Sequence, residues 1–223
     1  AGCSIVGGGR FNSIASSLAE TSGILGGLTN SISSPNSFIG GGQNNTISNY
    51  GNNNTISGGG NNSISAYVCH SVISGGTSNT ITSRWGAIGG GNSNSVSGQY
   101  AFVGGGKSNT SSGYASFTGG GICNVASGSC STISGGYCNI ASNNYSVVVG
   151  GVFNLASGGY SFIGNGGFGQ TASGSYSFIG SGTSNTASGN GAVIVGGSSN
   201  LANGANSFVG NGVANRAYCN GST

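Results

Sequence analysis

The sequence predicts an all-β fold, a parallel β-roll or β-solenoid of about 14 coils with a repeat of about 15 residues. Three observations predict it. An Asn recurs at a nearly constant spacing along the whole chain, two columns of apolar residues recur in step with it, and Gly, Ser and Asn supply 50, 42 and 29 of the 223 residues. The 35 % of apolar residues and the small net charge argue against disorder.

The repeat is anchored on an Asn that follows a Gly-rich segment. Nine of the thirteen intervals between anchors have the same length, that of Asn79 to Asn94, and the other four are slightly longer, with Gln170 standing in the anchor position once. We expect these amides to form a structural ladder at one corner of the coil, each bonding the next. The anchors are Asn12, Asn30, Asn45, Asn62, Asn79, Asn94, Asn109, Asn124, Asn139, Asn154, Asn185, Asn200 and Asn215.

Two apolar columns accompany the anchors. The first lies about six residues before each anchor, is β-branched, and is predicted to form the core. The second lies two residues after the anchor and changes from Ile to Ala near Ser111, which predicts a narrower interior that Tyr145, Tyr160 and similar residues refill. The first column is Val6, Ile24, Ile39, Ile56, Ile73, Ile88, Val103, Ile133, Val148, Ile163, Ile179, Ile194 and Val209.

Each repeat therefore reads as a short strand, a Gly turn, a second short strand and another turn. A helix is disfavoured because the apolar columns recur with the period of the whole repeat rather than every three or four residues, and because Gly is frequent throughout. A unit this small cannot bury its own apolar face, so identical units are expected to stack into one continuous core. No change of composition divides the chain, and we expect residues 1–223 to form one repeat domain, a segment of a longer fibre.

A further apolar column indicates an oligomer. The residue before the first column is often large and apolar, and adjacent strand residues point to opposite faces, so this column is expected on the outside. Soluble monomers rarely expose so large an apolar stripe, which favours burial in a homotrimer. The alternative is that both columns face one thick interior. The Phe residues of the proposed interface are Phe38, Phe102, Phe117, Phe162, Phe178 and Phe208.

The composition excludes several classes of function. One acid, Glu20, and one His, His70, cannot supply the paired groups of general acid–base catalysis, so we expect no enzyme activity. The four Lys and Arg residues are scattered, which argues against nucleic-acid binding. No apolar run is long enough to insert in a membrane. Neither a cofactor nor a metal site is expected.

Cysteine usage leaves two alternatives open. Six Cys residues are present without a zinc-type pair. Cys123 and Cys138 occupy the same repeat position one coil apart, and stacked coils would bring their Cα atoms to about 4.8 Å, within reach of a disulfide. Parallel stacked side chains often have poor torsion angles for this bond, so buried thiols are the other alternative.

The repeat resembles a known one. Segments such as ASGSYSFIGSGTSNTASG and ASGGYSFIGNGGFGQTASG are similar to the head repeats of trimeric autotransporter adhesins (the YadA-like head), which also resemble repeats in phage and large-virus fibre proteins. The resemblance covers almost the whole chain. It implies a left-handed parallel β-roll, three chains around one axis, and an extracellular location on a cell or virion surface. The Cys residues and the longer early repeats depart from the bacterial adhesins and favour a virus or phage fibre.

The expected function is a non-enzymatic structural or adhesive module of a surface fibre. Its faces of Ser, Thr, Asn and Tyr would attach weakly and at many points to a host receptor or glycan. Two alternatives are a self-assembling extracellular filament and an ice-binding solenoid. The latter rests on a column of Ser and Thr directly after the anchors, which Val125, Ile140 and Leu155 interrupt.

Overall fold

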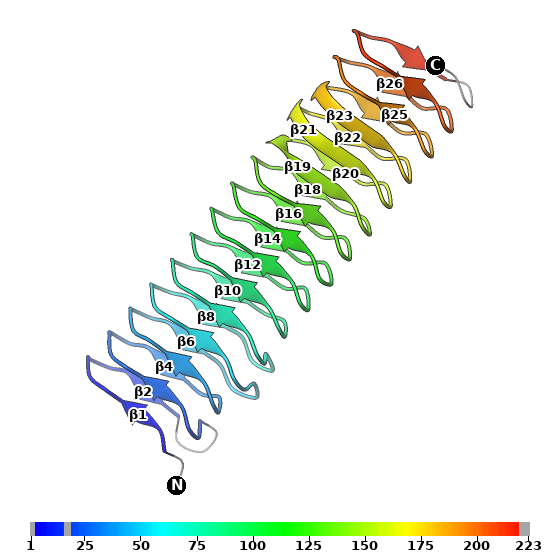
Figure 1. The fold of residues 1–223 in the computed structure, drawn as a ribbon. Helices are drawn as coiled ribbons and strands as arrows, with labels where there is room; N and C mark the ends of the chain where they lie inside the picture. Colours follow the sequence, from blue (N-terminus) through cyan, green and yellow to red (C-terminus); the bar gives the residue numbers. More distant parts are fainter. Residues whose placement is uncertain (1–2, 16–18, 219–223) are drawn as a thin grey trace. The chain divides into compact units, whose positions relative to one another are not determined.

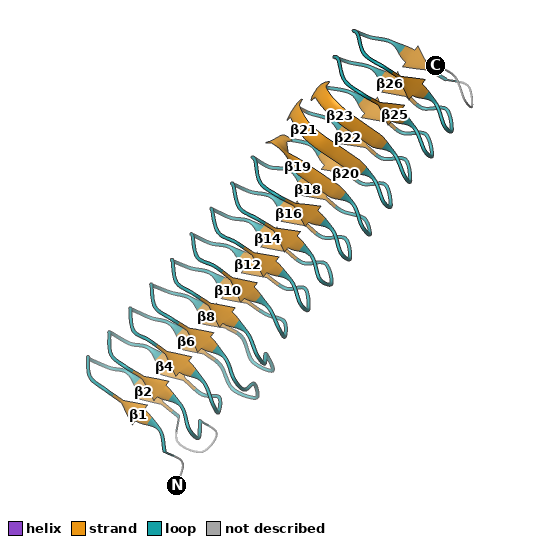
Figure 2. Cartoon of the chain, in the orientation of Figure 1, coloured by secondary structure: helices purple, strands orange, loops and turns teal. Residues whose placement is uncertain are grey.

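The computed structural model describes residues 3–15 and 19–218, and the described residues form only strands, bridges and turns (Figure 2). The prediction of an all-β parallel solenoid with about 14 coils is confirmed. Nowhere in these residues does a helix occur that could cross a membrane. The chain divides into two compact units, Ala1–Ser111 and Ser112–Thr223, which contain the same type of coil.

In the first unit, odd-numbered and even-numbered strands form two separate parallel sheets, each in chain order (Figure 1). The odd-numbered strands are β1 (Ile5–Val6), β3 (Gly23–Ile24), β5 (Phe38–Ile39), β7 (Thr55–Ile56), β9 (Val72–Ile73), β11 (Ala87–Ile88) and β13 (Phe102–Val103). The even-numbered strands are β2 (Ser13–Ile14), β4 (Ser31–Ile32), β6 (Thr46–Ile47), β8 (Ser63–Ile64), β10 (Thr80–Ile81), β12 (Ser95–Val96) and β14 (Thr110–Ser111).

The second unit has the same arrangement of odd-numbered and even-numbered sheets. The odd-numbered strands are β15 (Phe117–Thr118), β17 (Thr132–Ile133), β19 (Val147–Val152), β21 (Phe162–Phe168), β23 (Phe178–Thr183), β25 (Val193–Ile194) and β27 (Phe208–Val209). The even-numbered strands are β16 (Val125–Ala126), β18 (Ile140–Ala141), β20 (Leu155–Ala156), β22 (Thr171–Ala172), β24 (Thr186–Ala187), β26 (Leu201–Ala202) and β28 (Arg216–Ala217).

Equivalent residues of successive coils lie side by side. Ile81 of β10 pairs with Val96 of β12, and the Thr80 N–H donates to the Asn94 carbonyl at 2.9 Å. Most strands contain only a pair of residues, because turns occupy the rest of each coil. The strands β19, β21 and β23 are longer, and a register shift between β21 and β23 accompanies the slightly longer interval from Asn154 to Gln170.

The core lies between the two sheets of each unit. In the first unit Ile or Val side chains from both sheets are buried, whereas in the second unit Ile or Val from the odd-numbered sheet meets Ala from the even-numbered sheet. All residues of the predicted core column are buried except Val6, for which the prediction is wrong. Val6 is 45 % exposed because it lies in the first described coil, which has a neighbouring coil on one side only.

The prediction that Tyr residues refill the interior beside the Ala column is also wrong. Tyr145 and Tyr160 are exposed, and their rings stack on each other outside the coil at 4.8 Å. Each lies in the left-handed region of the backbone, with φ near +58°, at the corner before an odd-numbered strand. The core of the second unit instead consists of Ile or Val side chains from the odd-numbered sheet packed against Ala side chains from the even-numbered sheet.

Glycine is required at one corner of the coil. Gly91 has φ of +88°, and a Cβ atom built on it would lie 2.8 Å from the Gly106 nitrogen and 2.7 Å from Nδ2 of Asn94. Residues three before the anchor repeat this arrangement in most coils, including Gly76 and Gly121. The backbones of successive coils therefore approach too closely at this corner for any side chain.

Candidate functional site

The anchor Asn residues lie at the corner between the two sheets, and most of them bond three backbone groups. Asn79 is buried, and its Nδ2 group donates to the carbonyls of Gly75 in its own coil and Gly91 in the next, both at 3.0 Å. Its Oδ1 atom accepts from the backbone N–H of Asn94 at 3.0 Å. One amide thus closes its own corner and joins two coils.

This pattern repeats along both units. The Asn139 Nδ2 group donates to the Gly135 and Gly151 carbonyls at 3.1 and 2.9 Å, and its Oδ1 accepts from the Asn154 backbone at 3.0 Å. Gln170 takes the same place, with its Oε1 accepting from the Asn185 N–H at 3.2 Å. In the first and last described coils Asn12 is half-buried and Asn215 is exposed, whereas the other anchors are buried. The column is therefore part of the framework of the fold.

The outer face of the odd-numbered sheet carries the apolar column proposed as an interface. Phe38, Phe117, Phe178 and Phe208 are exposed by 36 to 41 %, while Phe102 and Phe162 are half-buried. Phe162 and Phe178 stack at a centroid distance of 5.3 Å. The alternative in which both apolar columns share one interior is wrong, because only the Ile and Val column faces inward.

The outer face of the even-numbered sheet differs between the two units. In the first unit every residue of its outer column is Ser or Thr: Ser13, Ser31, Thr46, Ser63, Thr80, Ser95 and Thr110. In the second unit the column is mainly apolar: Val125, Ile140, Leu155, Thr171, Thr186, Leu201 and Arg216. All the interruptions of the Ser and Thr column therefore fall in the second unit.

Cys123 and Cys138 are free thiols, and both are partly exposed rather than buried. Partial removal from water and the neighbouring Cys123 raise the pKa of the Cys138 thiol. The same two cysteines, Cys138 foremost, raise the pKa of the Tyr137 hydroxyl. A raised pKa lowers the thiolate fraction of Cys138 at neutral pH, and the thiolate is the reactive form.

Exposed aromatic stacks at the corners were not recognised as such from the sequence. Tyr50 stacks on Tyr67 at 5.0 Å, Trp85 stacks on Tyr100 at 4.8 Å, and Tyr160 stacks on Tyr176 at 5.0 Å. The signal that could have found them is an aromatic residue at the same repeat position in successive coils. It was obscured in the first unit because the intervals that follow Asn45 and Asn62 are longer than most.

The described residues contain no group of three or more His, Cys, Asp or Glu side chains that could hold a metal ion. His70 lies beside Trp85, with the two rings parallel at 6.1 Å.

No family model matches the chain, and a search of curated proteins gives no match either.

Proposed function

We propose that this chain is a non-enzymatic structural or adhesive module of an extracellular fibre on a cell or virion surface, assembled as a left-handed homotrimer. The observation that carries the proposal is the exposed Phe column on the odd-numbered sheet. Burying an exposed Phe contributes about 1.5 to 3 kcal/mol, and these residues are already partly covered, so each gives about 1 to 2 kcal/mol. The resemblance to adhesin head repeats supports three chains.

The rest of the surface fits an adhesive role better than a catalytic one. The corners present Ser, Asn and Tyr at intervals of one coil, and repetition of weak contacts raises the overall avidity of such a surface. End-to-end growth into a filament is the alternative assembly, and electron micrographs of the purified protein distinguish it from a trimer of fixed length.

Replacing Phe162 and Phe178 together by Ser is expected to dissociate the trimer at micromolar concentration. The double substitution removes about 2 to 4 kcal/mol of apolar burial per chain. Sedimentation velocity measures the result. The matched control replaces Phe153 and Phe168, which are 49 and 53 % exposed and pack edge to face at 5.6 Å outside the proposed interface. A wild-type monomer, or equal dissociation by the control, contradicts the proposal.

Ice binding is a second candidate, favoured by the unbroken Ser and Thr column of the first unit. Hydroxyl groups there repeat at the strand spacing of about 4.8 Å, a regular array that could match an ice lattice. The protein is then expected to show thermal hysteresis, and Thr80→Tyr, which disrupts the flat face, to abolish it. Thr77→Tyr, at an exposed corner of the same unit outside this column, is the control. Absence of hysteresis in the wild-type protein excludes this candidate.

A further inference from the structure

A change in coil length creates a pocket at one corner of the first unit. The intervals from Asn45 and from Asn62 to the next anchors are each two residues longer than the interval from Asn79 to Asn94. The two longer corners pair with each other, as the bridge between Asn52 and Cys69 shows. The next corner is two residues shorter, so the longer corner overhangs it.

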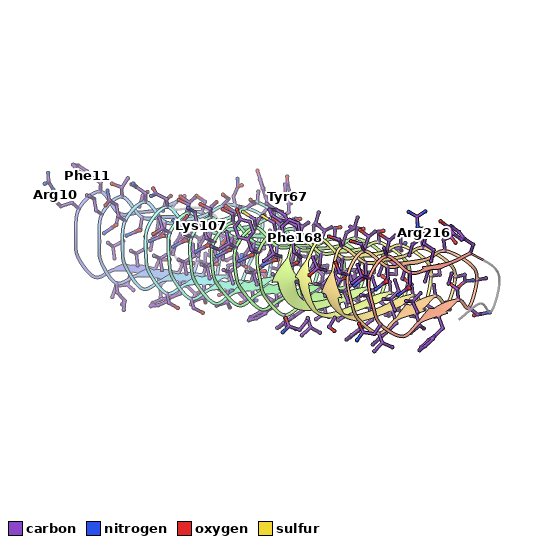
Figure 3. All side chains as sticks on the ribbon, turned by 90° about the horizontal axis from the view of Figure 1, so that it is seen from above. Arg10, Phe11, Tyr67, Lys107, Phe168 and Arg216 are labelled. Carbon is purple, nitrogen blue, oxygen red and sulfur yellow. The ribbon has the colours of Figure 1, made fainter. Side chains whose placement is uncertain are left out.

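Tyr67 lies at the end of this overhang and is 63 % exposed (Figure 3). Its ring stacks on Tyr50 of the preceding coil, and in the described part of the chain no other ring contacts it. The aromatic stack therefore stops at Tyr67, because the following coil lacks the two extra residues. One face of the Tyr67 ring is therefore directed toward the shorter coils and is not covered by another ring.

Arg84 supplies a positive charge to the same place. Its Nε group donates to the Tyr67 carbonyl at 3.3 Å, which ties the guanidinium to the overhanging corner. No carboxylate is paired with Arg84 among the described residues, and its two Nη groups make no hydrogen bond with them. A guanidinium with free Nη donors suits a planar anion such as a carboxylate, which it can bind through two parallel hydrogen bonds.

Apart from Ala66, the remaining walls of the pocket are polar. Its volume is about 320 Å³, at the small end of the range for ligand sites, and Tyr67, Arg84, Ala66, Thr82, Ser83 and Gln99 line it. The hydroxyl groups of Thr82 and Ser83 and the Gln99 amide can both donate and accept hydrogen bonds. An aromatic face, a guanidinium and short neutral polar groups together complement a sugar ring that carries an anionic group, because the C–H face of a sugar packs on the ring.

We propose that this corner binds an acidic saccharide. The anionic group of the sugar pairs with Arg84, the sugar ring packs on Tyr67, and Gln99 and Thr82 bond its hydroxyl groups. The proposal rests on the adhesive role proposed above, for which it names the class of ligand. It requires no catalytic step, because the pocket contains no acid, base or nucleophile positioned for one.

Binding of sialyllactose, sulfolactose and lactose to the full chain, measured by saturation-transfer NMR and calorimetry, tests this proposal. The two acidic sugars carry a carboxylate and a sulfate respectively, and lactose is the neutral match. We expect weak binding of at least one acidic sugar and about tenfold weaker binding of lactose. Adenosine monophosphate, which also combines an anion with a ring, serves as the control for ligand class.

Substitutions then locate the site. Arg84→Gln is expected to weaken binding about tenfold, and Tyr67→Ala by a similar factor, whereas Tyr67→Phe keeps the ring and most of the affinity. Arg10→Gln is the matched control, since Arg10 is an exposed Arg of the same unit that lies 5.1 Å from the Phe11 ring outside this pocket (Figure 3). Unchanged circular dichroism spectra verify that each variant folds.

The proposal is overturned if no acidic sugar binds, if lactose or adenosine monophosphate binds equally well, or if Arg10→Gln weakens binding as much as Arg84→Gln. Sedimentation of the same samples separates this result from the proposed assembly. A trimer without sugar binding contradicts the pocket alone, and a monomer that binds the acidic sugar contradicts the trimer alone.

Discussion

Replacing Asn79 by Leu is expected to destabilise the first unit by about 2 to 6 kcal/mol, because it leaves two polar groups without a partner and each such buried group costs about 1 to 3 kcal/mol. Leu has the branched shape of Asn but removes the partners of the Gly75 carbonyl and the Asn94 N–H. It also removes one of the two donors to the Gly91 carbonyl, which keeps the Thr77 N–H at 2.8 Å. Urea unfolding followed by circular dichroism measures the change.

Two further substitutions make this experiment specific. Asn79→Asp keeps an acceptor for the Asn94 N–H but loses both donors and buries a charge, so it is also expected to be strongly destabilising. Asn92→Ala is the control, since Asn92 is exposed in the same unit and should change stability by about 0.5 kcal/mol or less. Hydrogen exchange should accelerate first at the coils on either side of Asn79. Wild-type stability of Asn79→Leu would contradict the role assigned to the ladder.

Replacing Gly91 by Ala is expected to cost about 3 kcal/mol or more, because the new methyl group meets backbone atoms that cannot rotate away. The Cβ would lie 2.7 Å from Nδ2 of Asn94 and 2.8 Å from the Gly106 nitrogen, and still closer to the Gly106 carbonyl oxygen. The φ of +88° adds strain of its own. Thermal unfolding of the variant is the measurement.

Gly105→Ala is the matched control for this prediction. Gly105 belongs to the equivalent corner of the next coil, yet a Cβ built on it meets no atom within 4 Å. Its stability should change by about 1 kcal/mol or less, and Ala can even stabilise such a site by restricting the unfolded chain. If both variants unfold at the same temperature, close approach of the coils is not the reason for glycine at this corner.

The fold could be predicted from the sequence because the same side chain recurs at the same place in each coil. Ile64 and Ile81 belong to one column two residues after the anchor, and both are completely buried. A single short strand says almost nothing about the fold, whereas thirteen nearly equal intervals between anchors predict a stack of similar coils. A structural Asn column at this corner was also foreseeable, since Asn is the one polar residue retained at that position in nearly every repeat. The expected amide-to-amide bonds occur in only some coils, and the Asn79 side chain bonds backbone groups instead.

The features that could not be predicted from the sequence lie where the regular repeat changes or ends. Val6 has the residue type of the core but not the second neighbouring coil that buries it. Tyr145 was expected inside because of the small Ala side chains, but its backbone lies in the left-handed region at a corner of the coil and its side chain is exposed. The pocket beside Tyr67 and Arg84 arises because one coil is longer than the next. Aligning the repeats by their equivalent residues hides this difference in length.

The unequal corners near Tyr67 have a consequence for how such a protein can diversify. Ile64 and Ile81 of the core remain aligned although two residues were added beside one of them and not the other. Insertions at this corner thus alter the surface without disturbing the interior. The surface at this corner can therefore change one coil at a time while the core stays the same.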